Sequence, residues 1–252
     1  MLRGQNLAGP STPKLKINSP TKLRNIFYSC AMQSGWWVHD LYERSPVLLA
    51  SWVFWVLLSI MLHELAHGWA AIWQGDNTPR DMDRMNLNPL THMGPTSLIF
   101  FALIGFAWGM MPVDPSRFRW GRRGEAAVAF AGPLMNIVLA LISLTALGIW
   151  LARGPVNTKI YENLYIFLYA GGWLNFFLAA FNLLPVPPLD GSRILAGLNR
   201  PARDIIESPQ VMQFGWLAIF ALSMLGFFAP IERFCTMIST EYVQRIATIF
   251  VG

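Results

Sequence analysis

The stretch WVFWVLLSIMLHELAHGWAAIW, residues 52–73, is almost wholly apolar and still contains two histidines and a glutamate. As an α-helix rising ~1.5 Å per residue it is about 33 Å long, enough to cross the ~30 Å hydrocarbon core of a bilayer. Ionisable side chains are costly at membrane depth and usually serve a function there. The stretch therefore predicts a membrane-spanning helix that carries a functional site.

The composition of the whole chain agrees with this prediction. Of 252 residues, 54% are hydrophobic and 13% are charged, whereas soluble domains carry about 25% charged residues. This balance excludes both a soluble globule and a disordered chain. Further apolar stretches follow at 96–111, 126–151, 161–184 and 211–228. We expect an all-α integral membrane protein of about four to six transmembrane or re-entrant segments.

Two of these segments carry more specific expectations. Residues 96–111 are short and contain two glycines, so we expect them to dip into the membrane and return. The polar stretch Thr78–Asn88 is expected to form a small β-hairpin-like loop, with an edge strand able to hold an extended peptide.

The domain organisation predicted from these patterns has three parts. Residues 1–45 form a basic, partly disordered tail with an interfacial segment, 46–229 the membrane domain, and 230–252 an amphipathic C-terminal segment. The formal net charge of +5 comes from short basic stretches between apolar segments. The positive-inside rule explains it, so no nucleic-acid partner is expected. Cys30 and Cys235 lie far apart and indicate neither a disulfide framework nor a cysteine metal site.

The candidate site begins with His63-Glu64-Leu65-Ala66-His67. On a helix, residues i and i+4 share one face, so His63 and His67 can bind a single metal ion. Glu64, beside the first histidine, is placed to act on water as a general base. This is the arrangement of zinc peptidases, and it predicts one Zn²⁺ ion.

A catalytic zinc also needs a third protein ligand. His39 and His92 are candidates, and Asp190 is the best one, because it follows a proline-rich break at the end of an apolar helix. Irregular backbone at membrane depth is tolerated only where it lines a protein cavity. The spacing alone leaves open the alternative that Asp190 caps the helix that follows it.

Three motifs in order give the chain a family resemblance: HELAH, the AGPLMN of residues 131–136 and the NLLPVPPLDG of residues 182–191. Together they resemble the site-2 protease family of intramembrane zinc metalloproteases, peptidase family M50. The pattern is closest to the short bacterial branch that lacks PDZ and CBS domains. Residues 75–92 are similar to a further segment of this branch. The chain departs from the pattern of this branch in two places, at Ser192 and at the Met93–Pro95 segment. Neither departure removes a metal ligand, but the substrate preference of other members of the branch does not carry over to this chain.

The resemblance implies that His63, His67 and Asp190 bind one zinc ion, with Glu64 as the catalytic base. It also implies that Asn136 and Asn182 line the substrate path. Their alternative role is hydrogen bonding between helices, which buried asparagines perform in membranes in any case.

The function implied is hydrolysis of peptide bonds in transmembrane-segment substrates, as in regulated intramembrane proteolysis. The expected partners are a transmembrane protein substrate and the lipid bilayer. Arginines before the 126–151 stretch and after the 161–184 stretch place the site nearer the cytoplasmic face, in a bacterial cytoplasmic membrane. The substrate's identity and the oligomeric state are not predicted.

Two other functions stay open. One is a different HExxH membrane protease, in which a downstream glutamate would be the third ligand. The other is a non-catalytic zinc-binding membrane protein or transporter. The LDG motif argues against the first, and the presence of Glu64 argues against the second.

Overall fold

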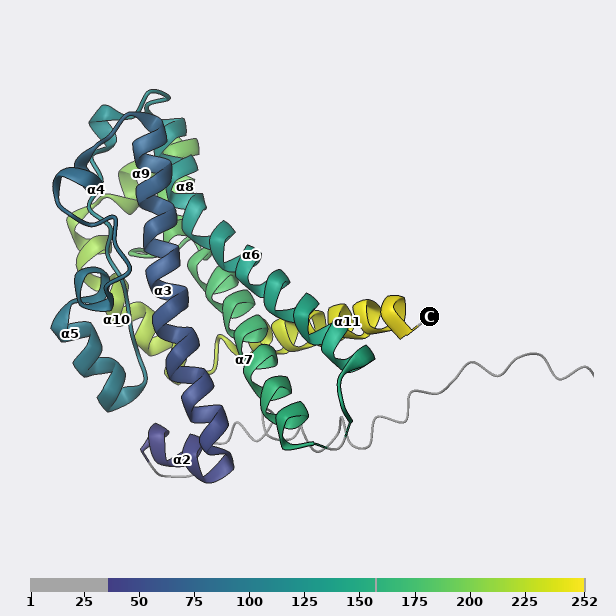
Figure 1. Ribbon diagram of the computed structural model, residues 1–252. Coiled ribbons are helices and arrows are strands. Elements are labelled where there is room, and N and C mark those ends of the chain that lie inside the picture. The colour runs from purple at the N-terminus through teal and green to yellow at the C-terminus, as the bar shows by residue number, and fades with distance from the viewer. Residues whose placement is uncertain (1–35, 157, 252) are drawn as a thin grey trace, which may run out of the picture. The chain divides into compact units, whose positions relative to one another are not determined.

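The computed structural model describes residues 36–156 and 158–251, and within them every regular element is a helix (Figure 1). Three helices are long: α3 (Pro46–Gln74), α6 (Arg122–Arg153) and α7 (Lys159–Asn182). The shorter elements are α2 (Trp37–Arg44), α4 (Thr78–Asp81), α5 (Pro89–Ile104), the 3₁₀ turn η1 (Pro115–Arg117), α8 (Asp190–Leu198), α9 (Arg200–Ile206), α10 (Pro209–Met224) and α11 (Ala229–Val251).

The three long helices have the length and hydropathy of membrane spans. The shortest of them, α7, has 24 residues and at ~1.5 Å per residue is about 36 Å long, more than the ~30 Å that a span requires. The prediction of an all-α membrane protein is therefore confirmed.

Small residues let the long helices approach one another closely. A Cβ atom added at Gly171 of α7 would lie 2.2 Å from the Trp55 ring of α3, and one at Gly172 would lie 2.2 Å from Leu144 of α6. The Trp55 indole N–H also donates to the carbonyl of Phe167 at 2.8 Å. Such small-residue contacts and interhelical hydrogen bonds hold membrane helices together, because burial from water contributes little there.

The end of α3 is tied to a segment that lies far along the chain. Gly75 ends the helix in the left-handed conformation, with φ of 102°. The next residue, Asp76, is fully buried. Its carboxylate accepts hydrogen bonds from the backbone N–H and the hydroxyl of Thr78 and from the backbone N–H of Asp114, the last at 2.7 Å.

Helix α5 and the residues after it turn the chain back on itself, and the predicted dip of residues 96–111 into the membrane stays a prediction. The helix bends at Gly94 and ends at Gly105, both with positive φ. The following residues, which we call the return segment (residues 105–114), run back beside α5: the N–H of Met110 donates to the carbonyl of His92, and Trp108 bonds through both backbone groups to the Ser97 hydroxyl.

The β-hairpin-like loop predicted at Thr78–Asn88 is wrong, because the structure has the short helix α4 there, followed by turns. Local side-chain bonds explain the difference. The Asn86 side chain accepts from the N–H of Asn88 and donates to the carbonyl of Asp83. Such bonds offer the backbone an alternative to strand pairing.

The C-terminal helix α11 packs against α6 and α7. Its buried residues recur every four positions, at Cys235, Ser239, Val243 and Ala247. The Trp173 indole of α7 donates to Thr236, and Thr145 of α6 bonds to Tyr242. The helix thus buries one face on the protein, and its predicted position at the membrane interface stays a prediction.

Candidate metal centre

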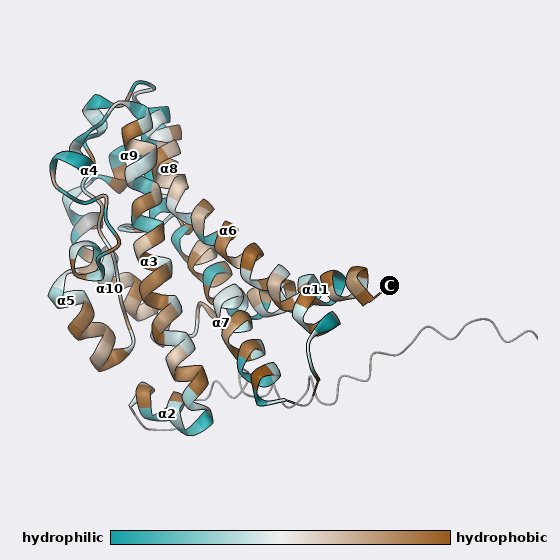
Figure 2. Ribbon diagram, viewed as in Figure 1, coloured by the Kyte–Doolittle hydropathy of each residue, from teal (hydrophilic) through white to brown (hydrophobic). Residues whose placement is uncertain are grey.

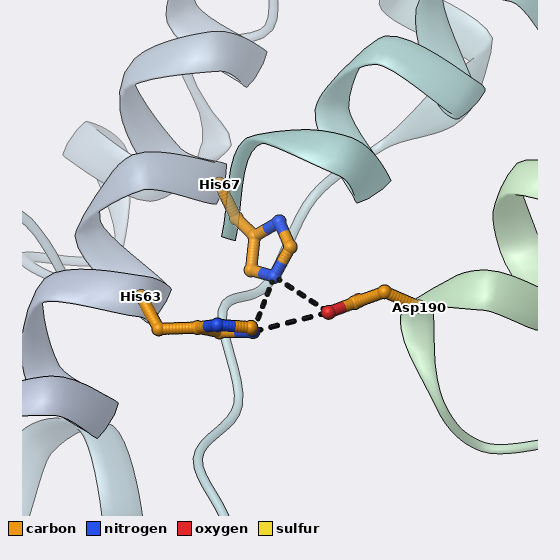
Figure 3. Close-up of side chains that lie close together, drawn as sticks. All are labelled: His63, His67 and Asp190. Carbon is orange, nitrogen blue, oxygen red and sulfur yellow. Dashed lines mark hydrogen bonds and ion pairs between the residues drawn. The ribbon is translucent and has the colours of Figure 1, made fainter. Parts of the chain in front are cut away.

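The two histidines of HELAH and Asp190 meet in the structure (Figure 3). His63 and His67 lie one turn apart in the C-terminal half of α3, and their Nε2 atoms are 3.0 Å apart. The Oδ2 atom of Asp190 lies 3.0 Å from Nε2 of His63 and 3.4 Å from Nε2 of His67. Among the described residues, this is the group of histidine, cysteine and acidic side chains that could hold a metal ion.

The spacing of these three atoms suits zinc. Ligand atoms at ~2.0–2.1 Å from a tetrahedral zinc are about 3.4 Å apart, close to the observed 3.0–3.4 Å. Two imidazoles and a carboxylate are also a ligand set that zinc accepts in enzymes and that leaves one position open.

Gly132 of α6 leaves space in front of the two imidazoles. A Cβ atom at this residue would lie 2.4 Å from Nε2 of His67 and 2.5 Å from Nε2 of His63. These are the atoms that face Asp190, so any side chain at position 132 would enter the space that a metal ion needs. The arrangement fits a bound ion at this point.

Asp190 reaches the histidines because the chain folds back onto the end of α7. A Cβ atom at Gly191 would lie 2.2 Å from the carbonyl oxygen of Leu183, so only glycine permits this approach. The alternative role of Asp190 as a helix cap is wrong, because α8 begins at Asp190 itself and Leu189 occupies the cap position without a side-chain hydrogen bond.

Helix α6 also contacts the Nδ1 atom of each histidine, the ring nitrogen that does not face Asp190. Nδ1 of His67 lies 2.7 Å from the backbone carbonyl of Val128, and Nδ1 of His63 lies 2.6 Å from Oδ1 of Asn136. A carbonyl oxygen can only accept, so each Nδ1 donates and each Nε2 keeps a lone pair for a metal. Ligating histidines commonly have such outer partners.

Glu64 is buried on the same helix but faces a different neighbour. A Cβ atom at Gly109, in the return segment, would lie 2.4 Å from Oε1 of Glu64. The base predicted from the sequence is therefore covered by the segment that folds back from α5.

The two asparagines predicted to line the substrate path differ in their surroundings. Asn136 is fully buried, and its contacts are those of the alternative role, hydrogen bonding between helices. Asn182 is half-buried at the end of α7 and donates to the carbonyl of Leu178 in its own helix. Contact of either residue with substrate stays a prediction.

The other candidate ligands lie outside the group. His39 is exposed on α2. His92 is buried, and its Nε2 bonds to the carbonyl of Asn86 at 2.6 Å, while Nδ1 has no partner among the residues that the structure describes. Cys235 is a buried free thiol on α11, and Cys30 lies outside the described residues.

Sequence reasoning missed Asn175, which bonds to Asn136 at 2.9 Å. A lone amide inside the apolar stretch of α7 was the signal that could have indicated it, because polar side chains in membrane helices usually have a partner. It also did not place Gly132 or Gly109 at the site, where the first approaches the two imidazoles and the second approaches the Glu64 carboxylate.

Comparison with known proteins adds an independent line of evidence. The family model described as "Peptidase family M50" matches residues 149–226. The "Putative zinc metalloprotease YwhC" of Bacillus subtilis is 36% identical over 73% of this chain and 84% of its own length. The "Putative zinc metalloprotease Rip2" of Mycolicibacterium smegmatis is 30% identical over 70% of this chain and 66% of its own length.

A more distant relative is the "Zinc metalloprotease MJ0392" of Methanocaldococcus jannaschii, 27% identical over 63% of this chain and 39% of its own length. No solved structure matches the chain.

Proposed function

Because the chain belongs to peptidase family M50, the site-2 protease family, and is a zinc metalloprotease of the membrane, we propose that it cleaves peptide bonds within transmembrane segments of other proteins. The observation that carries this proposal is the position of the metal group on the span α3. His63 and His67 are buried in an apolar helix of 29 residues. Such groups are costly at membrane depth, which suggests that the substrate is also brought to that depth.

The proposed roles follow from the geometry. His63, His67 and Asp190 would hold the zinc ion and leave one position open. The zinc, when bound, acidifies water and polarises the substrate carbonyl. The Glu64 carboxylate takes the proton of the attacking water and returns it to the nitrogen of the leaving amine.

A glutamate-liganded HExxH protease is disfavoured by the third residue of the group, which is an aspartate. A non-catalytic zinc protein is disfavoured by Glu64, since a buried carboxylate next to the histidines has no purpose in merely storing the ion.

The distribution of charge supports a site near the cytoplasmic face of a bacterial cytoplasmic membrane. Figure 2 shows hydrophilic residues gathered where α3 ends, α6 begins and α8 and α9 lie. These elements are in contact: Gly197 of α8 packs on the carbonyl of Arg122, and Arg203 of α9 lies 3.7 Å from Glu125 of α6. Arginines at one end of the spans are retained on the cytoplasmic side by the positive-inside rule.

The decisive experiment compares the full chain with Glu64→Gln and Asp190→Ala in bacterial membranes. Glu64→Gln should keep its zinc and reduce cleavage by about 10²- to 10⁴-fold, the usual contribution of a general base. Asp190→Ala should lose both zinc and cleavage. Zinc content is measured on the purified chain, and cleaved proteins are identified by mass spectrometry as fragments present only with the active chain.

The positions of the new chain ends test the substrate class. Ends inside apolar segments of single-span proteins support the proposal, and ends confined to soluble segments overturn it. Unchanged zinc content in Asp190→Ala would refute Asp190 as the third ligand.

A further inference from the structure

A buried chain of hydrogen bonds runs from His63 across two neighbouring spans. Nδ1 of His63 on α3 lies 2.6 Å from Oδ1 of Asn136 on α6. Nδ2 of Asn136 donates to Oδ1 of Asn175 on α7 at 2.9 Å. Nδ2 of Asn175 donates to the backbone carbonyl of Gly171 at 2.9 Å. Both asparagines are fully buried.

The backbone carbonyl of Gly171, the last group in this series of hydrogen bonds, sets the direction of all the others. A backbone carbonyl can only accept, so Asn175 must turn its NH₂ group toward Gly171 and its oxygen toward Asn136. Asn136 must then present its NH₂ group to Asn175 and its oxygen to His63. His63 in turn has to carry its proton on Nδ1, which leaves the Nε2 lone pair free.

The two histidines thus reach the same protonation pattern by different means. His67 donates directly to a backbone carbonyl, that of Val128. A backbone carbonyl can present only an acceptor, so this bond alone fixes the proton on Nδ1 of His67. His63 faces an amide side chain, which could present either its oxygen or its NH₂ group. Without a fixed neighbour, Asn136 could flip and favour the wrong tautomer of His63.

We propose that Asn175 is a positioning residue of the metal centre, which acts through Asn136 to keep Nε2 of His63 available to zinc. The inference rests on the proposed function, because it assigns His63 as a ligand. The simpler role for Asn175 is to join two helices, as asparagine does in many membrane proteins. The two roles make different predictions. If Asn175 is a positioning residue, its effect on zinc binding depends on whether residue 136 can turn a donor toward His63, whereas a residue that only joins helices has the same effect whatever stands at position 136.

A pair of substitutions separates the two roles. Asn175→Leu keeps a side chain of similar size but removes the acceptor for Asn136, and it should weaken zinc binding by about ten- to a hundredfold, as the loss of outer partners does. Asn136→Asp offers His63 a carboxylate, which can only accept when ionised. In the Asn136→Asp background, Asn175→Leu should therefore change zinc affinity by no more than about threefold, because residue 175 no longer sets the proton on His63.

The measurements use the full chain in detergent. Zinc affinity is obtained by competition with a chelator, and the absorption spectrum of the cobalt-substituted chain reports the ligand geometry. We expect an altered cobalt spectrum for Asn175→Leu and a restored one for the double variant. Asn175→Ala is measured in parallel, so that a packing defect caused by leucine does not decide the outcome.

Ser143→Ala is the matched control. Ser143 is a buried side chain of α6 whose hydroxyl donates to the carbonyl of Leu168 on α7 at 2.8 Å. Its loss removes a hydrogen bond between the same two helices without touching the site, so zinc affinity and the cobalt spectrum should not change.

Equal losses of zinc affinity from Asn175→Leu in the wild-type and Asn136→Asp backgrounds would overturn the positioning role and leave only helix joining. So would wild-type zinc affinity in both Asn175 single variants. These readouts need no substrate. Failure of the cleavage experiment would therefore count against the proposed function alone. Failure of the comparison of Asn175→Leu in the wild-type and Asn136→Asp backgrounds would count against the role of Asn175 alone.

Discussion

Two segments lie against the HELAH turn of α3, and they contact different parts of it. Helix α6 approaches the imidazoles through Gly132 and holds them from behind through Val128 and Asn136. The return segment approaches the carboxylate of Glu64 through Gly109. One side of the site therefore holds the candidate metal ligands, and the other covers the candidate base.

The two segments also differ in how they are attached. Helix α6 is 32 residues long and packs against α3, α7, α8 and α11. The return segment has no regular structure between α5 and η1, and it is held by a few hydrogen bonds, among them those of Ser97 and Asp76. Zinc binding and reaction rate should therefore be separable by substitution. Changes on α6 should lower zinc affinity, and changes on the return segment should lower the rate while zinc stays bound.

The largest effect is expected at Gly132. In Gly132→Ala the new methyl group would lie about 2.4–2.6 Å from both imidazoles, in the space that the ion needs. Zinc affinity should fall by about a hundredfold, the upper end of what disturbed ligand surroundings cost, and cleavage should be lost with it. Zinc content after dialysis against a chelator measures this, with Leu134→Ala, an exposed position on the same helix, as the control. Full zinc occupancy in Gly132→Ala would show that α6 can move away from the ligands.

A smaller effect, and on rate alone, is expected at Gly109. In Gly109→Ala the methyl group would lie 2.4 Å from Oε1 of Glu64, so the carboxylate must turn aside. Misplacement of a catalytic group by about 1 Å can cost roughly a hundredfold in rate. Cleavage should fall by about ten- to a hundredfold while zinc content stays at that of the wild type. Loss of zinc in this variant would contradict the division of the site into two sides.

The smallest effect is expected at Asp76, which ties the return segment to the end of α3. The Asp76 carboxylate accepts from three donors, the backbone N–H and hydroxyl of Thr78 and the backbone N–H of Asp114. In Asp76→Asn an NH₂ group replaces one carboxylate oxygen, so one of these donors loses its acceptor. The cost is about 1–3 kcal/mol, so we expect a lower unfolding temperature, a several-fold loss of rate and unchanged zinc. Thermal unfolding and cleavage assays measure these quantities.

Asp114→Asn is the control for Asp76→Asn. The Ser116 hydroxyl and backbone N–H, together with Arg117, hold the pKa of Asp114 below its usual value, so this partly exposed carboxylate is charged at neutral pH. Its replacement removes the same charge but keeps the backbone N–H that Asp76 accepts. An equal loss of stability in both variants would mean that charge at this end of α3, and not the tether, is what matters.

Much of the fold could be predicted from the sequence, because the signals were strong and local. The spans follow from long apolar stretches, and the return of the chain after α5 follows from a helix too short to cross. The error at Thr78–Asn88 came from treating a polar stretch as a strand, when its Asp and Asn side chains bond to their own backbone.

The pairing of His63 and His67, with Glu64 between them, was determined by the sequence itself, because the helical repeat places residues four apart on one face whatever the rest of the chain does. The meeting of His63 with Asp190, 127 residues away, was decided only by the tertiary structure. So were the closeness of Gly132 and Gly109 to the site and the hydrogen bonds through Asn175. Contacts between helices depend on how α3, α6 and α7 pack, and no local spacing along the chain encodes that packing.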